Sequence, residues 1–208
     1  LETQRSGAGQ VVDTAMVDGS AVLMAMFWAF RAMGAFDEDH RGTNLLDTGA
    51  HFYDVYRCAD GEYVSIGSIE PQFYALLKEK AGLSEEAFAD QNNPARWPEL
   101  KEKLTQGCLQ KTQAEWCELM EGTDVCFAPV LNFKDAPSHP ANVARDTYIE
   151  MDGVTQPAPA PRFSETPGDV PRPGVAPGTD SRELLVSLGY SGDEVDALID
   201  AGVVQIAG

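Results

Sequence analysis

Residues 52–71, FYDVYRCADGEYVSIGSIEP, carry the clearest structural signal in the chain. Phe52–Arg57 and Glu62–Ile69 are both rich in the β-branched and aromatic residues that favour strands. The two runs are joined through Ala59-Asp60-Gly61, and an Asp-Gly pair between such runs is a strong hairpin signal. The sequence therefore predicts an antiparallel hairpin that ends just before Pro71.

Helical patterns follow this hairpin. Pro71–Lys80 carries apolar residues at helical spacing, and its helix should begin at Pro71 and end at Gly82. The same spacing predicts three further helices, over Ser84–Asp90, Trp97–Gln110 and Gln113–Glu121.

The remainder of the chain towards the C-terminus is less regular. Val125–Leu131 is an apolar strand in which Pro129 indicates an edge position, because proline cannot donate a ladder hydrogen bond. Prolines recur from Pro157 to Pro177, which predicts an extended surface segment. Two short capped helices should follow, with capping boxes at Asp180/Glu183 and Ser191/Glu194 and glycine stops at Gly189 and Gly202.

The segment before the hairpin is more apolar. Gln10–Ala15 is expected to form a short strand, and Met16–Met33, which lacks proline, a helix buried on most sides. Asp37–Thr43 reads as a charged loop. Leu1–Gly7 has no initiating methionine and resembles the tail of a helix ending in a glycine turn, so we expect the chain to be part of a longer protein.

Composition excludes several classes of protein. With 208 residues and 43% hydrophobic residues, the chain is long and apolar enough for one or two globular domains. Its 33 acidic residues against 15 basic ones give a formal charge of −18, which disfavours nucleic-acid and membrane-surface partners. The longest apolar run, Ala21–Phe30, is half the length of a membrane helix.

The cysteines and histidines show no metal or redox pattern. Four cysteines lack any CxxC pair or nearby ligand histidine, which predicts buried reduced thiols, no metal and a cytoplasmic protein; they are Cys58, Cys108, Cys117 and Cys126. His40 and His139 lie in loops, and a satisfied or exposed His51 is favoured over a catalytic one.

Glu70 is the strongest candidate for a functional residue. It ends the second strand and precedes Pro71, at a cap position where Ser, Thr, Asp or Asn is preferred. The alternative is a solvated carboxylate that gains about 0.3–1 kcal/mol from the helix dipole. Because the dipole favours the ionised form, Glu70 should act as an anion that orients or charges a neighbour.

Motifs along nearly the whole chain resemble the family III CoA-transferase superfamily. GSIEPQFY at residues 67–74 narrows the resemblance to the α-methylacyl-CoA racemase branch. The other motifs, in family order, are GQVVDTAMVDG (9–19), LDTGA (46–50), DGEY (60–63), GTDVC (122–126), APRFS (160–164) and LGYS (188–191).

The resemblance implies an enzyme that interconverts (2R)- and (2S)-2-methylacyl-CoA thioesters. The α-proton is removed to give an enolate and returned on the other face, with acyl-CoA as the substrate and no cofactor. In the family the proton-handling His and Asp lie in the N-terminal half, which is absent here, so this fragment alone should be inactive. Glu70 corresponds to the glutamate that hydrogen-bonds the catalytic histidine, and Tyr53, Ile69 and Pro71 are expected to contact the substrate.

The resemblance also implies an α/β fold organised as an interlocked homodimer. Residues 1–44 would leave a Rossmann-like large domain, residues 45–140 would form a small α+β domain, and residues 141–208 would return to the large domain. The active site would lie between the large domain of one subunit and the small domain of the other. Two alternatives stay open: a CoA-transferase of the same superfamily, and a non-catalytic assembly module.

Overall fold

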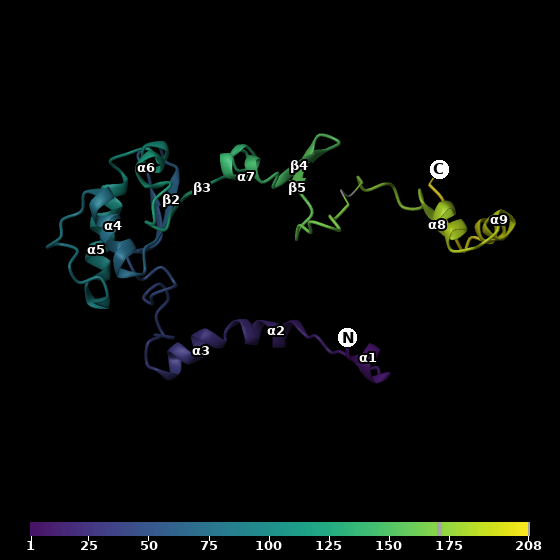
Figure 1. The fold of residues 1–208 in the computed structure, drawn as a ribbon, viewed down its shortest axis with the longest axis horizontal. Helices are drawn as coiled ribbons and strands as arrows, with labels where there is room; N and C mark the ends of the chain where they lie inside the picture. The colour runs from purple at the N-terminus through teal and green to yellow at the C-terminus, as the bar shows by residue number, and fades with distance from the viewer. Residues whose placement is uncertain (170–171, 208) are drawn as a thin grey trace. The chain divides into compact units, whose positions relative to one another are not determined.

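A computed structural model describes residues 1–169 and 172–207 of the chain. It divides the chain into two compact units, Leu1–Leu131 and Asn132–Gly208 (Figure 1). The domain limits at 44/45 and 140/141 stay a prediction.

The predicted hairpin is confirmed at the centre of the first unit. β1 (Tyr53–Arg57) pairs with β2 (Tyr63–Gly67) in antiparallel register, with Tyr53 opposite Gly67. Gly61 has a φ of 90°, a conformation that glycine adopts without strain. β3 (Phe127–Val130) adds antiparallel to β2 and gives the order β1-β2-β3, so Pro129 lies on an edge strand as predicted.

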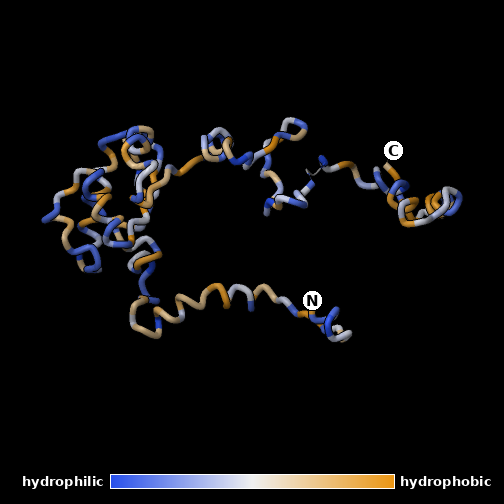
Figure 2. Tube along the Cα trace, viewed as in Figure 1, coloured by the Kyte–Doolittle hydropathy of each residue, from blue (hydrophilic) through white to orange (hydrophobic). Residues whose placement is uncertain are grey.

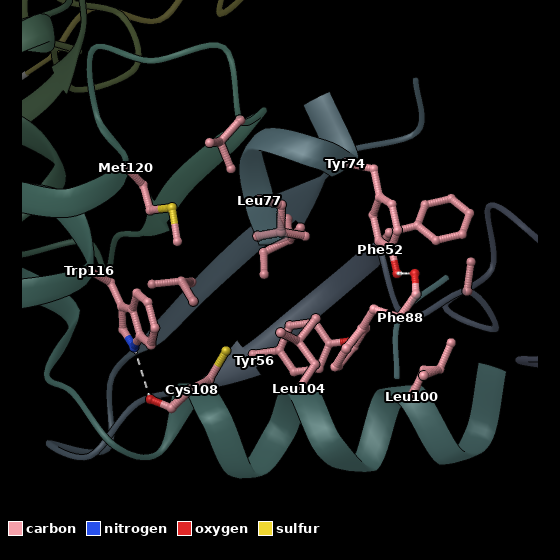
Figure 3. Close-up of a cluster of buried hydrophobic side chains, with 14 of the residues drawn as sticks. Phe52, Tyr56, Tyr74, Leu77, Phe88, Leu100, Leu104, Cys108, Trp116 and Met120 are labelled. Atoms are coloured by element: carbon pink, nitrogen blue, oxygen red, sulfur yellow. Dashed lines mark hydrogen bonds between the residues drawn. The ribbon is translucent and has the colours of Figure 1, made fainter. Parts of the chain in front are cut away.

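Helices enclose one face of this sheet. α4 (Pro71–Ala81) begins and ends as predicted, with Gly82 in the left-handed conformation, and α5 (Trp97–Cys108) and α6 (Gln113–Met120) follow. Figure 3 shows α5 beside the sheet, with Leu100, Leu104 and Cys108 directed at Tyr56 and its neighbours. The strands contribute Tyr56, Val64 and Ile66, all at least 96% buried, which matches the two-residue period of a strand with one covered face.

The predicted helix over Ser84–Asp90 is wrong. The segment forms a turn in which the Phe88 amide bonds the Ser84 carbonyl at 3.1 Å, and Phe88 is buried. One turn provides too few hydrogen bonds to sustain a helix, and a 3-10 helix at Pro94–Arg96 then leads into α5.

The N-terminal predictions are confirmed only in part. α1 (Glu2–Ser6) ends at a left-handed Gly7 as expected, but Gln10–Ala15 forms no strand, and Val11 is 96% exposed. A strand needs a hydrogen-bonding partner, and no described segment pairs with this one.

The long helix predicted over Met16–Met33 is two helices. α2 (Met16–Leu23) and α3 (Ala25–Ala32) meet at Met24, whose conformation interrupts the first helix. Figure 2 shows hydrophobic residues along much of both helices. The predicted burial is wrong for the described chain, since neither helix contains a buried residue.

The second unit contains a hairpin that sequence analysis missed. β4 (Tyr148–Met151) and β5 (Val154–Pro157) pair antiparallel around Asp152-Gly153, the same Asp-Gly signal as in the first hairpin. α7 (Pro140–Ala144), preceded by a 3-10 turn over Ala136–Ser138, comes before it.

The C-terminal helices match the prediction except at one cap. α8 (Ser181–Ser187) and α9 (Gly192–Asp200) follow the proline-rich segment, which forms no helix or strand at 158–169 and 172–177. Val170 and Pro171 of that segment lie outside the described residues. The capping box at Ser191/Glu194 is confirmed, whereas that at Asp180/Glu183 is wrong because the Asp180 carboxylate pairs with Arg172 instead.

Candidate functional site

Glu70 lies at the N-cap of α4, as predicted. Its backbone is extended, with φ −72° and ψ 143°, and Pro71 occupies the first helical position. Its side chain is exposed and makes no capping hydrogen bond. A carboxylate at a helix N-terminus that bonds no helix N–H keeps its lone pairs for another group.

Hydrogen bonds to two distant parts of the chain hold the backbone of the segment that carries Glu70; we call this set of bonds the clamp. The hydroxyl of Ser68, which is fully buried, donates a 2.5 Å hydrogen bond to the Val125 carbonyl. The Gln91 amide donates to the carbonyls of Ser68 (3.1 Å) and Ile69 (2.8 Å). These contacts satisfy buried polar groups on both sides of the strand end, so the backbone entering Glu70 is fixed.

Sequence analysis missed Ser68 and Gln91 as supports of this site. Gln91 is 92% buried, and its own carbonyl accepts a 2.8 Å bond from the Trp97 indole. A buried glutamine is unusual. No local pattern in the sequence shows, however, that its side-chain amide donates hydrogen bonds to carbonyls at the end of a strand more than twenty residues earlier.

Cys126 lies beside the same strand end. The Gly67 amide donates to the Cys126 carbonyl at 2.8 Å, and Cys126 takes a left-handed conformation with φ 59°. Partial desolvation by neighbouring atoms and the negative charges of Glu70 and Asp124 raise the pKa of the Cys126 thiol. The thiol therefore stays protonated at neutral pH and is a poor nucleophile.

The three predicted substrate-contact residues have different environments. Tyr53 opens β1 and is 37% exposed, with its ring beside Gly67. Ile69 is half-buried and packs against the core, and Pro71 is exposed next to Glu70. Tyr53 lines a shallow groove on the sheet, whereas Ile69, Glu70 and Pro71 do not line it.

That groove has a volume of about 400 Å³ and runs over the sheet face opposite the core. Side chains and backbone from all three strands and the loop before β1 line it: Leu46, Thr48, Tyr53, Asp54, Val55, Ser65, Ile66, Gly67, Cys126, Phe127 and Ala128.

His51 is satisfied on one side and buried, which agrees with the non-catalytic interpretation. Its Nε2 lies 2.7 Å from the Tyr74 hydroxyl, and that hydroxyl donates to the Phe88 carbonyl at 3.2 Å. Nε2 therefore carries the proton and donates to Tyr74, since this tautomer leaves no N–H unpaired at Nδ1, which has no partner among the described residues. Burial, together with the charge of Arg96, lowers the pKa of His51 to about 4.

The other histidines and the cysteines form no catalytic or metal site among the described residues. His40 is exposed and pairs with Asp37 at 2.9 Å, and His139 caps α7 in the second unit. In the described ranges no group of three or more His, Cys, Asp or Glu side chains could hold a metal ion. The cysteines are free: Cys58 and Cys108 are buried as predicted, whereas Cys117 is only partly buried and Cys126 is exposed, so the prediction is wrong for Cys126.

Comparisons with known proteins show which family the chain belongs to. CoA-transferase family III matches residues 1–181. The chain belongs to this family. The family III chain is 42% identical to mouse alpha-methylacyl-CoA racemase and 39% identical to the human protein of that name, in each case over 99% of its own length. It spans 54% of each relative, about half of their length.

Structural comparison agrees on the fold of this family III chain. A CAIB/BAIF family protein from Brucella suis superimposes with a TM-score of 0.63 over 90% of the chain and 50% of that protein, at 20% identity. The predicted resemblance and the mixed α/β family III fold are thus confirmed. Among helices in the described part, none is long and apolar enough to cross a membrane.

Proposed function

We propose that this chain provides the glutamate side of a racemase active site for 2-methylacyl-CoA thioesters. The observation that supports the proposal is the Glu70 carboxylate, exposed and without a capping bond, on a backbone clamped by Ser68 and Gln91. The type of reaction is inferred from the name of the curated relatives, alpha-methylacyl-CoA racemase.

In this reaction a base removes the proton on C2, the thioester carbonyl becomes an enolate oxygen, and an acid returns a proton on the opposite face. Two opposed acid/base groups are required. Glu70 would serve neither directly: as an anion it would accept the imidazole N–H of a histidine and stabilise the cation formed when that histidine takes the proton. The clamp on Ser68 and Ile69 would hold the carboxylate in position for this contact.

The proposal includes the setting of the site. The chain would act in a homodimer, because the apolar residues of α2 and α3 need a cover that the described residues do not provide. It would work in the cytoplasm, consistent with four free cysteines, on acyl-CoA without any additional cofactor.

Proton exchange tests the reaction. A 2-methylacyl-CoA incubated in deuterated buffer with the complete gene product should gain deuterium at C2 and lose its stereochemical purity. The 208-residue chain alone should catalyse no exchange above background, because Glu70 cannot reach both faces of C2. Exchange by the isolated chain would overturn the assignment of proton transfer to groups outside it.

A CoA-transferase is the second candidate, supported by the match to CoA-transferase family III. It would move CoA from one acyl group to a free carboxylate and leave C2 unlabelled. Transfer of CoA to an added acid without C2 exchange would favour it over the racemase. A protein with neither activity would be an assembly module.

A further inference from the structure

The position of Glu70 depends on the backbone on either side of it, because its side chain makes no capping hydrogen bond. On the N-terminal side, the clamp holds the carbonyls of Ser68 and Ile69. On the C-terminal side, the Glu70 carbonyl accepts a 3.0 Å hydrogen bond from the Tyr74 amide, which is the first hydrogen bond of α4. Tyr74 is therefore the residue that joins Glu70 to the helix that follows it.

The side chain of Tyr74 anchors this first turn of α4 to distant residues. Tyr74 is only 3% exposed, and its hydroxyl accepts from Nε2 of His51 at 2.7 Å and donates to the Phe88 carbonyl at 3.2 Å. Figure 3 shows this side chain reaching from α4 to Phe88, which lies in the α4–α5 loop, residues 82–96. Burial and the charge of Glu85 raise the pKa of the hydroxyl, so it stays protonated and donates at neutral pH.

The residues that hold the two sides of the candidate carboxylate belong to this one loop. Phe88 bonds the turn after the carboxylate, and Gln91 bonds the strand end before it. The Arg96 guanidinium braces both, because it donates to the Ala87 carbonyl at 3.0 Å and to the Asp90 carboxylate at 3.4 Å, in the residues directly before them. A displacement of one anchor is therefore shared by the other.

We propose that Tyr74 is a positioning residue, through which the α4–α5 loop completes its hold on Glu70 from both sides. The inference rests on the proposed function, in which the Glu70 carboxylate accepts the imidazole N–H of a histidine. Such a contact depends on distance and direction, and a misplacement of about 1 Å costs about 10²-fold in rate. Tyr74 itself touches no reacting atom; its hydroxyl keeps the first turn of α4, and with it the carboxylate, in place.

The experiment compares one substitution in two backgrounds of the complete gene product. Tyr74→Phe removes only the hydroxyl, and kcat for C2 exchange of a 2-methylacyl-CoA should fall by about 3- to 30-fold while KM stays within about 2-fold of wild type. In a Glu70→Gln background the same substitution should lower kcat by less than about 2-fold, because no carboxylate is left to position. A merely structural hydroxyl would lower kcat equally in both backgrounds.

Tyr56→Phe is the matched control. The Tyr56 hydroxyl is also buried and donates a 2.5 Å hydrogen bond to the His51 carbonyl, but it comes from β1 and bonds a residue outside α4 and the α4–α5 loop. Its loss should lower the free energy of unfolding, as the loss of a buried hydrogen bond does, and leave kcat within about 2-fold of wild type.

Arg96→Lys is the second variant, for the case that Tyr74→Phe does not fold. A lysine ammonium lacks the planar fork that lets Arg96 bond both Ala87 and Asp90, so the brace of the α4–α5 loop is weakened while the charge is kept. A loss of kcat of about 2- to 10-fold is expected, and it too should disappear in the Glu70→Gln background.

The outcomes separate this inference from the proposed function. If Glu70→Gln lowers kcat but Tyr74→Phe leaves it unchanged, or lowers it equally in both backgrounds, the positioning role is wrong and the proposed function remains. An equal loss of kcat in Tyr56→Phe would also overturn the role, since any buried hydroxyl would then have the same effect. If the wild type exchanges no proton at C2, or Glu70→Gln has normal turnover, the proposed function is wrong and the positioning role is wrong with it.

Discussion

The side-chain amide of Gln91 donates a 2.8 Å hydrogen bond to the carbonyl of Ile69, the residue that precedes Glu70. The same nitrogen also bonds the Ser68 carbonyl at 3.1 Å. One buried side chain thus joins the loop before α5 to the end of β2, and it fixes the backbone from which the candidate functional carboxylate projects.

Replacing Gln91 should destabilise the first unit. Gln91→Leu keeps the approximate volume but leaves the buried Ser68 carbonyl and the partly buried Ile69 carbonyl without this donor, at a cost of about 1–3 kcal/mol in unfolding free energy. Urea denaturation of the 208-residue chain measures the change. Gln106→Leu on the exposed face of α5, where the amide bonds only Glu102, should cost about 0.5 kcal/mol or less. Equal effects of the two variants on the unfolding free energy would contradict the claim that the hydrogen bonds of Gln91 stabilise the first unit.

Glu70→Gln should lower turnover far more than substrate affinity. The amide keeps the shape but loses the charge that stabilises a histidine cation, so kcat for C2 exchange should fall by about 10- to 10³-fold. The fold should remain intact because a helix-start carboxylate contributes about 1 kcal/mol at most. Glu79→Gln, on the same helix and also exposed, is the control and should retain the wild-type rate. A folded Glu70→Gln protein with normal turnover would show that Glu70 is only a solvated carboxylate without a role in the reaction.

His51 should make the first unit sensitive to acid. Its folded-state pKa of about 4 lies below the ordinary value of 6.5, so the unfolded state binds the proton more readily. The contribution of neutral His51 to the free energy of unfolding is fully present above pH 6.5. It falls as the pH drops towards 4, by up to about 1.4 kcal/mol per pH unit.

His51→Phe isolates this dependence. Its unfolding free energy, measured by urea denaturation at several pH values, should vary less than that of the wild type between pH 6.5 and 4. His40→Gln is the control, because His40 is exposed and should leave the slope in this window close to that of the wild type. A wild-type slope retained in His51→Phe would assign the acid sensitivity to other groups.

Two glycine-to-alanine changes should act in opposite directions. A Cβ on Gly49 would lie 2.4 Å from the Thr43 carbonyl carbon and 2.5 Å from the Asn44 oxygen, both backbone atoms that cannot yield. Gly49→Ala should therefore destabilise the chain by about 1–3 kcal/mol. Gly107→Ala lies within α5 and meets open space, so it should stabilise by about 0.5–1 kcal/mol. Thermal unfolding compares the two, and a destabilising Gly107→Ala would contradict the argument.

Features that depend on neighbouring residues could be predicted from the order of amino acids alone. Asp60-Gly61 specifies the hairpin, Pro71 and Gly82 delimit α4, and Ser191 caps α9, since each acts through its own backbone angles or a hydrogen bond within a few residues. The position of Glu70 at a helix start belongs to the same class, as does the family resemblance carried by the motif around it.

Features that depend on distant residues required the tertiary structure. Asp180 has capping-box spacing, yet its carboxylate pairs with Arg172, and the segment after Ser84 has helical spacing but forms only a turn that buries Phe88. The Gln91 clamp and the groove arise because strands and loops far apart in the chain are brought together by a common core. Local propensities contribute fractions of a kcal/mol each, so the burial of apolar side chains and of polar groups that need partners decides such cases.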